Sequence, residues 1–316
     1  MKLNKKYAAL VLAAFTTTAT FAKTKVVTTI FPEYDWVLNI AGEKINEIDI
    51  TLLLDNGVDL HSYQPSVKDI AKISTADIFI YVGGESDDWV KDVLRTSHNK
   101  KLKTINLLET LGERVKEEEI VEGMQLEDED EDEEETEYDE HVWLSLRNTQ
   151  ILCSTICEAL CSVNPTNALT YKANLTSYNA RLSALDAEYT KACKDAKFNT
   201  LLFGDRFPLR YLTDDYGLKY YAAFAGCSAE TEASFKTIAF LSSKVDELGL
   251  KSVCKIESGD GKIARTIIQS SKAKDASIVT FNSMQAVTKS DIKKGATYLG
   301  TMQSNLEALK KALGSN

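Results

Sequence analysis

Two patterns of apolar positions alternate along the chain: short apolar runs, and longer segments with apolar residues at helical spacing. The expected strands are residues 25–30, 48–54, 77–82, 103–107, 200–203, 218–224, 251–256 and 277–281. The expected helices are residues 32–41, 66–74, 87–94, 148–160, 208–216, 234–248, 262–270 and 298–313. Strands that alternate with helices form parallel βαβ units. The pattern therefore predicts an α/β protein whose parallel sheets are flanked by helices.

One helical pattern is much longer than the others. Asn164 and Pro165 form a helix-start signal, and residues 166–196 contain neither proline nor glycine. The apolar positions at helical spacing in this segment are Tyr171, Leu175, Tyr178, Leu182, Leu185 and Tyr189. A helix of this length spans roughly 45 Å. We therefore expect two lobes, residues 23–163 and 197–316, linked by a helix over residues 164–196.

The first 22 residues have the features of a signal peptide. Lys2, Lys5 and Lys6 precede an apolar stretch, residues 8–15, that is too short to cross a bilayer. Small residues stand at the expected cleavage site, which ends at Ala22, and no cysteine follows the apolar stretch. The sequence thus predicts a protein that is exported after cleavage, periplasmic or otherwise extracytoplasmic, with no lipid anchor.

Composition and charge narrow the possible partners. Of the 316 residues, 44% are apolar, which is ample for two cores. The net charge of −10 makes the chain a poor ligand for nucleic acid. Residues 127–140 are acidic except for Thr136 and Tyr138, and such a run repels itself and should be weakly ordered. It is either a solvated surface loop or a loose collector of cations.

Two of the three histidines lie in loops with a distinctive context. His61 follows the expected strand 48–54 and precedes a helix-start signal at Pro65 and Ser66. Ligands of open α/β sheets bind at such carboxyl ends of strands. His141 directly follows the acidic run, whereas His98 stands in a polar loop and is expected at the surface.

The six cysteines give a weaker signal. Cys153, Cys157 and Cys161 recur every four residues and share one face of the expected helix 148–160. Their neighbours are apolar, which favours packing in the core over metal binding. Cys193, Cys227 and Cys254 are too scattered to be paired from the sequence, although an exported protein could form disulfides.

Three segments together resemble a known family. Residues 58–66 read Val-Asp-Leu-His-Ser-Tyr-Gln-Pro-Ser, residues 139–145 read Asp-Glu-His-Val-Trp-Leu-Ser, and residues 298–313 form a closing Tyr-Leu-x-x-Met-x-x-Asn-Leu pattern. They are similar to the motifs of the cluster 9 solute-binding proteins, the receptors of zinc and manganese ABC importers. The one departure in the first motif is Leu60, where the family has proline.

The resemblance implies a fold and a site. In the family a long helix links two lobes, and a metal lies between them. His61 and His141 stand where the family has its first two histidine ligands. Zinc receptors of the family often carry a loop rich in histidine and acid at the place of residues 127–140, and this chain has the acids without the histidines.

At the places of the third and fourth ligands this chain departs from the family pattern. A strict count puts the third on Gly204, which has no side chain to offer, so Asp205 is the candidate, with a helix N-cap as its alternative role. The family's fourth ligand is usually an aspartate after the last strand. Here Asn282 stands at that place, and Glu257 or water are alternatives.

The resemblance implies an extracytoplasmic receptor rather than an enzyme. Two nitrogens with a few oxygens suit Zn²⁺, whereas Mn²⁺ prefers more oxygen and more charge and remains possible as cargo. We expect a monomer that delivers the metal to the permease and ATPase of an ABC importer. The alternatives are a manganese-specific receptor, a zinc-dependent hydrolase and a surface adhesin. The sequence contains no His-Glu-x-x-His and no Gly-x-Ser-x-Gly motif of a hydrolase.

Overall fold

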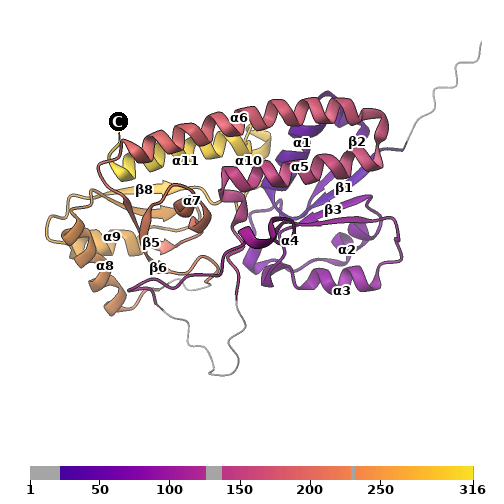
Figure 1. The fold of residues 1–316 in the computed structure, drawn as a ribbon. Coiled ribbons are helices and arrows are strands. Elements are labelled where there is room, and N and C mark those ends of the chain that lie inside the picture. The colour runs from indigo at the N-terminus through magenta and orange to yellow at the C-terminus, as the bar shows by residue number, and fades with distance from the viewer. Residues whose placement is uncertain (1–21, 126–136, 229–231, 316) are drawn as a thin grey trace, which may run out of the picture.

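The computed structural model describes residues 22–125, 137–228 and 232–315, which form two α/β lobes (Figure 1). The N-terminal sheet has the parallel order β2-β1-β3-β4, with strands β1 Thr24–Thr28, β2 Ile48–Leu52, β3 Ile78–Tyr81 and β4 Lys103–Asn106. The C-terminal sheet has the equivalent order β6-β5-β7-β8, with strands β5 Thr200–Arg206, β6 Lys219–Phe224, β7 Ser252–Ile256 and β8 Ser277–Phe281. The prediction of two parallel-sheet lobes is confirmed.

Helices flank both sheets and begin mostly where the sequence has a capping residue. The N-terminal lobe contains α1 Phe31–Ala41, α2 Val67–Ser74, α3 Trp89–Thr96, α4 Leu107–Leu111 and α5 Leu146–Val163. The C-terminal lobe contains α7 Arg210–Asp215, α8 Phe235–Leu248, α9 Lys262–Ser270, α10 Lys289–Lys293 and α11 Tyr298–Leu313. The hydroxyls of Ser66, Ser145 and Ser234 accept hydrogen bonds from backbone amides in the first turns of α2, α5 and α8.

The expected linking helix is α6, Ala168–Lys194, preceded by a 3₁₀ turn at Pro165–Asn167. Its 27 residues extend along both lobes, as Figure 1 shows. Its buried residues include the predicted apolar positions Tyr171, Tyr178, Leu182, Leu185 and Tyr189. A helix of this length is about 40 Å long, enough to join the two cores.

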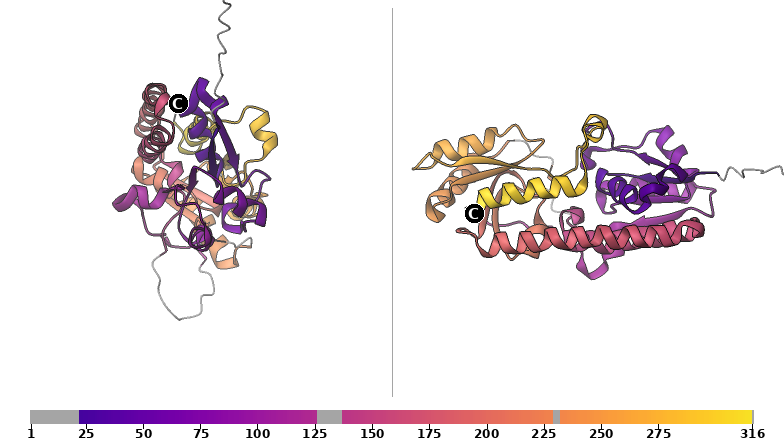
Figure 2. Two further views of the ribbon diagram at one scale, coloured as in Figure 1. Left: turned by 90° about the vertical axis from the view of Figure 1, so that its right-hand side faces the viewer. Right: turned by 90° about the horizontal axis from the view of Figure 1, so that it is seen from above.

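The C-terminal helix α11 also joins the lobes, which the sequence did not predict. Figures 1 and 2 show α11 lying beside α6. The backbone amide of its first residue, Tyr298, donates to the carboxylate of Asp35 in α1 at 3.0 Å, and its ring packs edge-on against Trp36. The Tyr298 hydroxyl donates to the carbonyl of Trp143 at 2.6 Å. Two helices therefore fix the lobes relative to each other.

Some expected boundaries were wrong. The strand expected over residues 25–30 ends at Thr28, because Ile30 is the N-cap residue of α1. The helix expected over residues 208–216 spans only residues 210–215. Among the residues that the structure describes, no helix is long and apolar enough to cross a membrane. The expected signal peptide lies outside the described residues except for Ala22.

The last residues of the acidic run are well ordered, contrary to the expectation for the whole run. Residues 127–136 lie outside the described part, but 137–140 are described. The Asp139 amide donates to the Lys116 carbonyl at 2.9 Å, and Tyr138 forms an antiparallel bridge with Glu117. Asp139 and Glu140 are each only 2% exposed. Their burial beside His141 gives these two carboxylates a role that composition alone did not indicate.

Candidate metal centre

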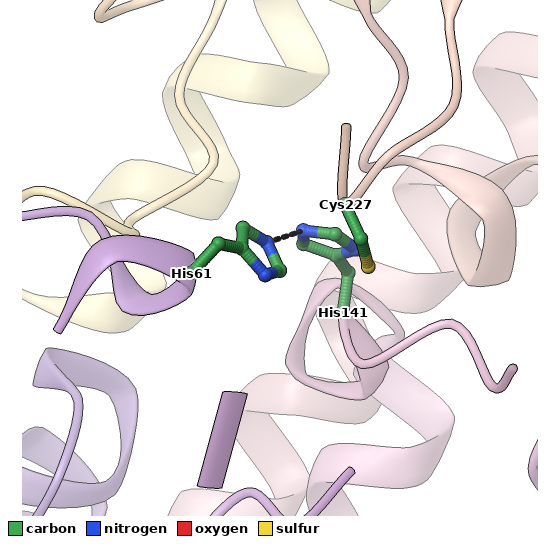
Figure 3. Close-up of side chains that lie close together, drawn as sticks. All are labelled: His61, His141 and Cys227. Atoms are coloured by element: carbon green, nitrogen blue, oxygen red, sulfur yellow. Dashed lines mark hydrogen bonds between the residues drawn. The ribbon is translucent and has the colours of Figure 1, made fainter. Parts of the chain in front are cut away.

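Two loops bring His61 and His141 together. His61 lies in a 3₁₀ turn, Leu60–Ser62, and the carboxylate of Asp59 caps that turn by accepting from the His61 amide at 3.1 Å. His141 precedes a second 3₁₀ turn, Val142–Leu144, and its own amide donates to the Asp139 carboxylate at 2.9 Å. The two Nε2 atoms are 3.2 Å apart (Figure 3). The prediction that the two histidines share one site agrees with this geometry.

The hydrogen bonds of the two Nδ1 atoms determine whether each Nε2 carries a hydrogen or a free lone pair. His61 Nδ1 lies 2.8 Å from the Ser86 hydroxyl and 3.5 Å from the Glu140 carboxylate. His141 Nδ1 lies 3.0 Å from the Asp139 carboxylate. An ionised carboxylate only accepts hydrogen bonds, so His141 Nδ1 carries hydrogen, whereas the Ser86 hydroxyl can either donate to His61 Nδ1 or accept from it. When His61 Nδ1 donates to Ser86, the two Nε2 lone pairs face each other across a space that suits one cation, either a proton or a metal ion.

The pKa shifts of the two rings are consistent with this arrangement. Burial, and then the neighbouring His141, lower the pKa of His61 to about 3, so His61 is neutral at physiological pH. Burial alone would lower the pKa of His141, but the Asp139 and Glu140 carboxylates together outweigh it, and the His141 pKa is raised. One neutral imidazole thus faces one imidazole whose charged form is stabilised.

Gln285 is a site residue that the sequence reasoning missed. Its Nε2 lies 3.0 Å from His141 Nε2, and its buried Oε1 has no hydrogen-bond partner among the described residues. Rotating the amide by half a turn exchanges the two atoms and presents the oxygen to the space between the histidines. Gln285 lies in the loop after β8, only three residues beyond Asn282. Considering every polar residue of that loop, rather than one position, would have found it.

The structure does not bring Asp205 and Asn282 into this group. The Asp205 carboxylate accepts from the backbone amides of Arg206, at 2.9 Å, and Ile256, at 3.2 Å. The Asn282 side-chain oxygen accepts from the Met284 amide at 2.9 Å. Both side chains therefore satisfy backbone donors of their own lobe, and the geometry does not support the prediction that they bind the metal.

The alternative carboxylate, Glu257, is also occupied elsewhere. It accepts from the Ser283 amide at 2.7 Å and from the Ser283 hydroxyl at 2.9 Å. Asp205 instead lines a cavity of about 510 Å³ at the ends of β5 and β7, together with Asp59 and Arg206. Residues of both lobes line this cavity.

Cys227 is the third residue of the group. Among the described residues, His61, His141 and Cys227 form a cluster whose potential ligand atoms all lie within 4.8 Å of one another. Cys227 lies in the loop after β6, and its amide donates to the Glu118 carboxylate at 3.0 Å. Burial raises the pKa of the Cys227 thiol, and the Glu118 and Asp139 carboxylates raise it further. The sequence analysis had left this cysteine unassigned.

A bilobed α/β fold with two imidazoles converging between buried acids defines the metal-binding class of solute-binding proteins. The chain belongs to the family described as "Zinc-uptake complex component A periplasmic", whose model matches residues 26–312. The resemblance noted in the sequence is thereby confirmed.

Individual relatives agree with this assignment. The chain is 31% identical over 294 residues to the zinc-binding protein AdcA of Streptococcus pyogenes serotype M3, covering 91% of this chain and 56% of the relative. The chain therefore spans about half the length of the AdcA relatives that it matches. It is 30% identical over 295 residues to the high-affinity zinc uptake system protein ZnuA of Bacillus subtilis, covering 92% and 88%.

Solved structures show the same fold. The Zn(II)-bound ZnuA-like domain of Streptococcus pneumoniae AdcA has a TM-score of 0.72 and 29% identity, with 92% of this chain and 99% of that chain covered. The metal-dependent lipoprotein YcdH of Bacillus subtilis has a TM-score of 0.74 and 28% identity, with the same coverage.

Proposed function

We propose that this protein is an extracytoplasmic receptor that binds Zn²⁺ and delivers it to an ABC importer. The observation that carries the proposal is the 3.2 Å approach of His61 Nε2 and His141 Nε2. In a tetrahedral zinc site with Zn–N bonds of about 2.0–2.1 Å, two nitrogens lie roughly 3.3 Å apart. The described structure therefore already has the spacing that a zinc ion requires.

The surrounding residues support a metal rather than a structural pair of histidines. The Asp139 carboxylate holds the His141 ring from behind, as carboxylates do for zinc-binding histidines, and the Ser86 hydroxyl holds the His61 ring at 2.8 Å. The Ser86 amide in turn donates to the Glu140 carboxylate at 2.9 Å. With its amide rotated, Gln285 would supply a neutral oxygen. Imidazole nitrogen suits zinc, whereas manganese prefers a set of hard oxygen ligands. The proposed cargo is accordingly zinc.

Location and partners follow from the family. Its model is described as periplasmic, and one relative, from Streptococcus pneumoniae, is named a zinc-binding lipoprotein. We propose that the chain is exported by cleavage of the segment 1–22 and acts as a monomer outside the cytoplasm. Its partners would be a membrane permease and an ATPase. We propose no catalytic turnover, because the relatives bear the names of binding and uptake proteins.

The test is the metal content and affinity of the mature protein. We expect one tightly bound zinc per chain, measured by mass spectrometry of the protein and by chelator competition. His61→Ala and His141→Ala should each weaken binding by at least about tenfold, since loss even of a residue that supports a ligand costs that much. The matched control is His98→Ala, because His98 is exposed and belongs to no group of potential metal ligands among the described residues. Unchanged zinc affinity in either site variant, or no zinc binding by the native chain, would contradict the proposal.

A further inference from the structure

We propose that the thiolate of Cys227 is a ligand of the bound metal, so that the site combines two imidazole nitrogens with one sulfur. This inference rests on the proposed function and narrows the cargo to thiophilic metals such as zinc. Figure 3 shows the Cys227 side chain next to the ring of His141, while His61 approaches the Nε2 end of the same ring. The three side chains come from three loops, after β2, before α5 and after β6.

The distances are close to those of a metal site. With a Zn–S bond of about 2.3 Å, a sulfur and a nitrogen in a tetrahedral site lie roughly 3.6 Å apart. The ligand atoms of His61, His141 and Cys227 lie within 4.8 Å of one another. The longest of these separations is therefore no more than about 1 Å above the tetrahedral value. Rotation about the cysteine χ1 angle can provide a movement of this size.

The loop that carries Cys227 is built to approach His141 closely. A Cβ atom added to Gly226 would lie 3.1 Å from His141 Cε1 and 2.9 Å from the carbonyl oxygen of Phe207. Such contacts are too short for most side chains, so glycine is what allows the backbone to pass this near the ring. The proximity of Cys227 to the histidines is thus a feature of the packing around Gly226.

The proposed set of ligands contains a single anion. The two imidazoles are neutral when they bind metal, and the Gln285 amide is neutral as well. A thiolate supplies one negative charge directly to the cation. On binding, the thiol proton is released to solvent as the metal–sulfur bond forms.

The unpaired side-chain oxygen of Gln285 is independent evidence that a cation binds beside the histidines. Gln285 is 2% exposed, its Nε2 lies 3.0 Å from His141 Nε2, and its oxygen has no partner among the described residues. A buried carbonyl without a partner is costly unless a cation or donor satisfies it. Two nitrogens, one sulfur and one amide oxygen form a four-coordinate set that contains a soft ligand. Such a set favours zinc over manganese, which prefers oxygen.

Cobalt(II) substitution tests the proposal, because cobalt replaces zinc and reports its ligands by absorption. In a non-thiol reductant, the wild-type protein should show visible ligand-field bands together with a near-ultraviolet charge-transfer band from sulfur to cobalt. Cys227→Ser should lose the charge-transfer band and bind zinc at least about tenfold more weakly. Its manganese affinity should hardly change, so the preference for zinc over manganese should fall.

Two further variants control for misfolding and for a contribution of other cysteines to the charge-transfer band. Gly226→Ala keeps the thiol but displaces the loop, and it should also lose the charge-transfer band. Cys161→Ser removes a half-buried cysteine near the end of α5 and should leave the spectrum unchanged. Thermal unfolding of each metal-free variant establishes that it folds.

The possible outcomes separate this proposal from the receptor function. Ligand-field bands without a charge-transfer band in the wild type, or a band that persists in Cys227→Ser, would overturn the sulfur ligand and leave the histidine site standing. Failure of the wild type to bind zinc or cobalt at all would overturn both.

Discussion

Arg206, at the end of β5 in the C-terminal lobe, forms an ion pair with Asp59 in the N-terminal lobe, with 2.7 Å between Nη2 and Oδ2. The side chains are only 16% and 19% exposed. Asp59 uses its other oxygen to cap the turn that holds His61. This single carboxylate therefore links the contact between lobes to the placement of His61, a proposed metal ligand.

A double-mutant cycle on this pair measures the coupling between the lobes. Arg206→Gln and Asp59→Asn should each lower the free energy of unfolding of the metal-free protein by about 1–3 kcal/mol, because each leaves a partly buried charge without its partner. The double variant should lose less than the sum, by about 0.5–3 kcal/mol. Urea denaturation monitored by circular dichroism gives these values. Strict additivity would show that the ion pair contributes no coupling.

Asp139 should be required for tight metal binding although it is not proposed to touch the metal. Its carboxylate lies 3.0 Å from His141 Nδ1 and fixes that ring. Asp139→Asn should weaken zinc binding by about 10–100-fold, the usual loss for a residue that supports a metal-binding histidine. Chelator competition gives the affinity. Asp92→Asn, an exposed carboxylate in α3, is the control and should bind zinc as the wild type does.

Two buried acids should make the protein less stable as pH rises. Burial, and then the charge of Asp87, raise the pKa of Glu33 to about 8. Burial, and then Glu140, raise the pKa of Asp87 to about 7. Between about pH 5 and pH 8 the unfolded chain has released these protons while the folded chain still holds them. The free energy of unfolding therefore decreases with rising pH across this range, by an amount on the order of a few kcal/mol.

Glu33→Gln tests that explanation. The substitution removes one of the two titrating groups, so the decrease in unfolding free energy between about pH 5 and pH 8 should be smaller than in the wild type. Chemical denaturation of metal-free protein at several pH values measures the slope. Glu43→Gln, at an exposed position, is the matched control and should keep the wild-type slope. An unchanged slope in Glu33→Gln would exclude Glu33 as a source of the pH dependence.

Removing residues 127–135 should leave the equilibrium affinity for zinc nearly unchanged. The converging atoms of His61, His141, Cys227 and Gln285 all belong to other segments. The deletion ends before Glu137, whose carbonyl accepts from the Glu118 amide at 2.9 Å, so the ordered end of the acidic run remains anchored. Stopped-flow measurement would show whether metal capture becomes slower, as expected for loss of attractive charge. A large drop in equilibrium affinity would mean that the deleted acids bind the metal directly.

The sequence by itself determined the architecture and the two histidines proposed as ligands. The features that predicted the helices and strands are local: their periodicity, the capping serines, and the absence of proline and glycine from residues 166–196. Such features favour the same local structure whatever the tertiary contacts are. The contexts of His61 and His141 were equally local, because each histidine stands within its own short motif. Both sheets, the helix α6 and the pair of histidines could therefore be predicted.

Only the tertiary structure decided which other side chains reach the histidines. Asn282 and Gln285 lie in the same loop, but Asn282 bonds to the Met284 amide and Gln285 points to His141. Asp205 is held by the amide of Ile256, which is 51 residues away in sequence. Cys227 approaches His141 because Gly226 lets the backbone come close. The partner of each side chain therefore depends on which backbone amides and rings lie near it after distant segments have folded together. A local sequence pattern contains no information about those neighbours.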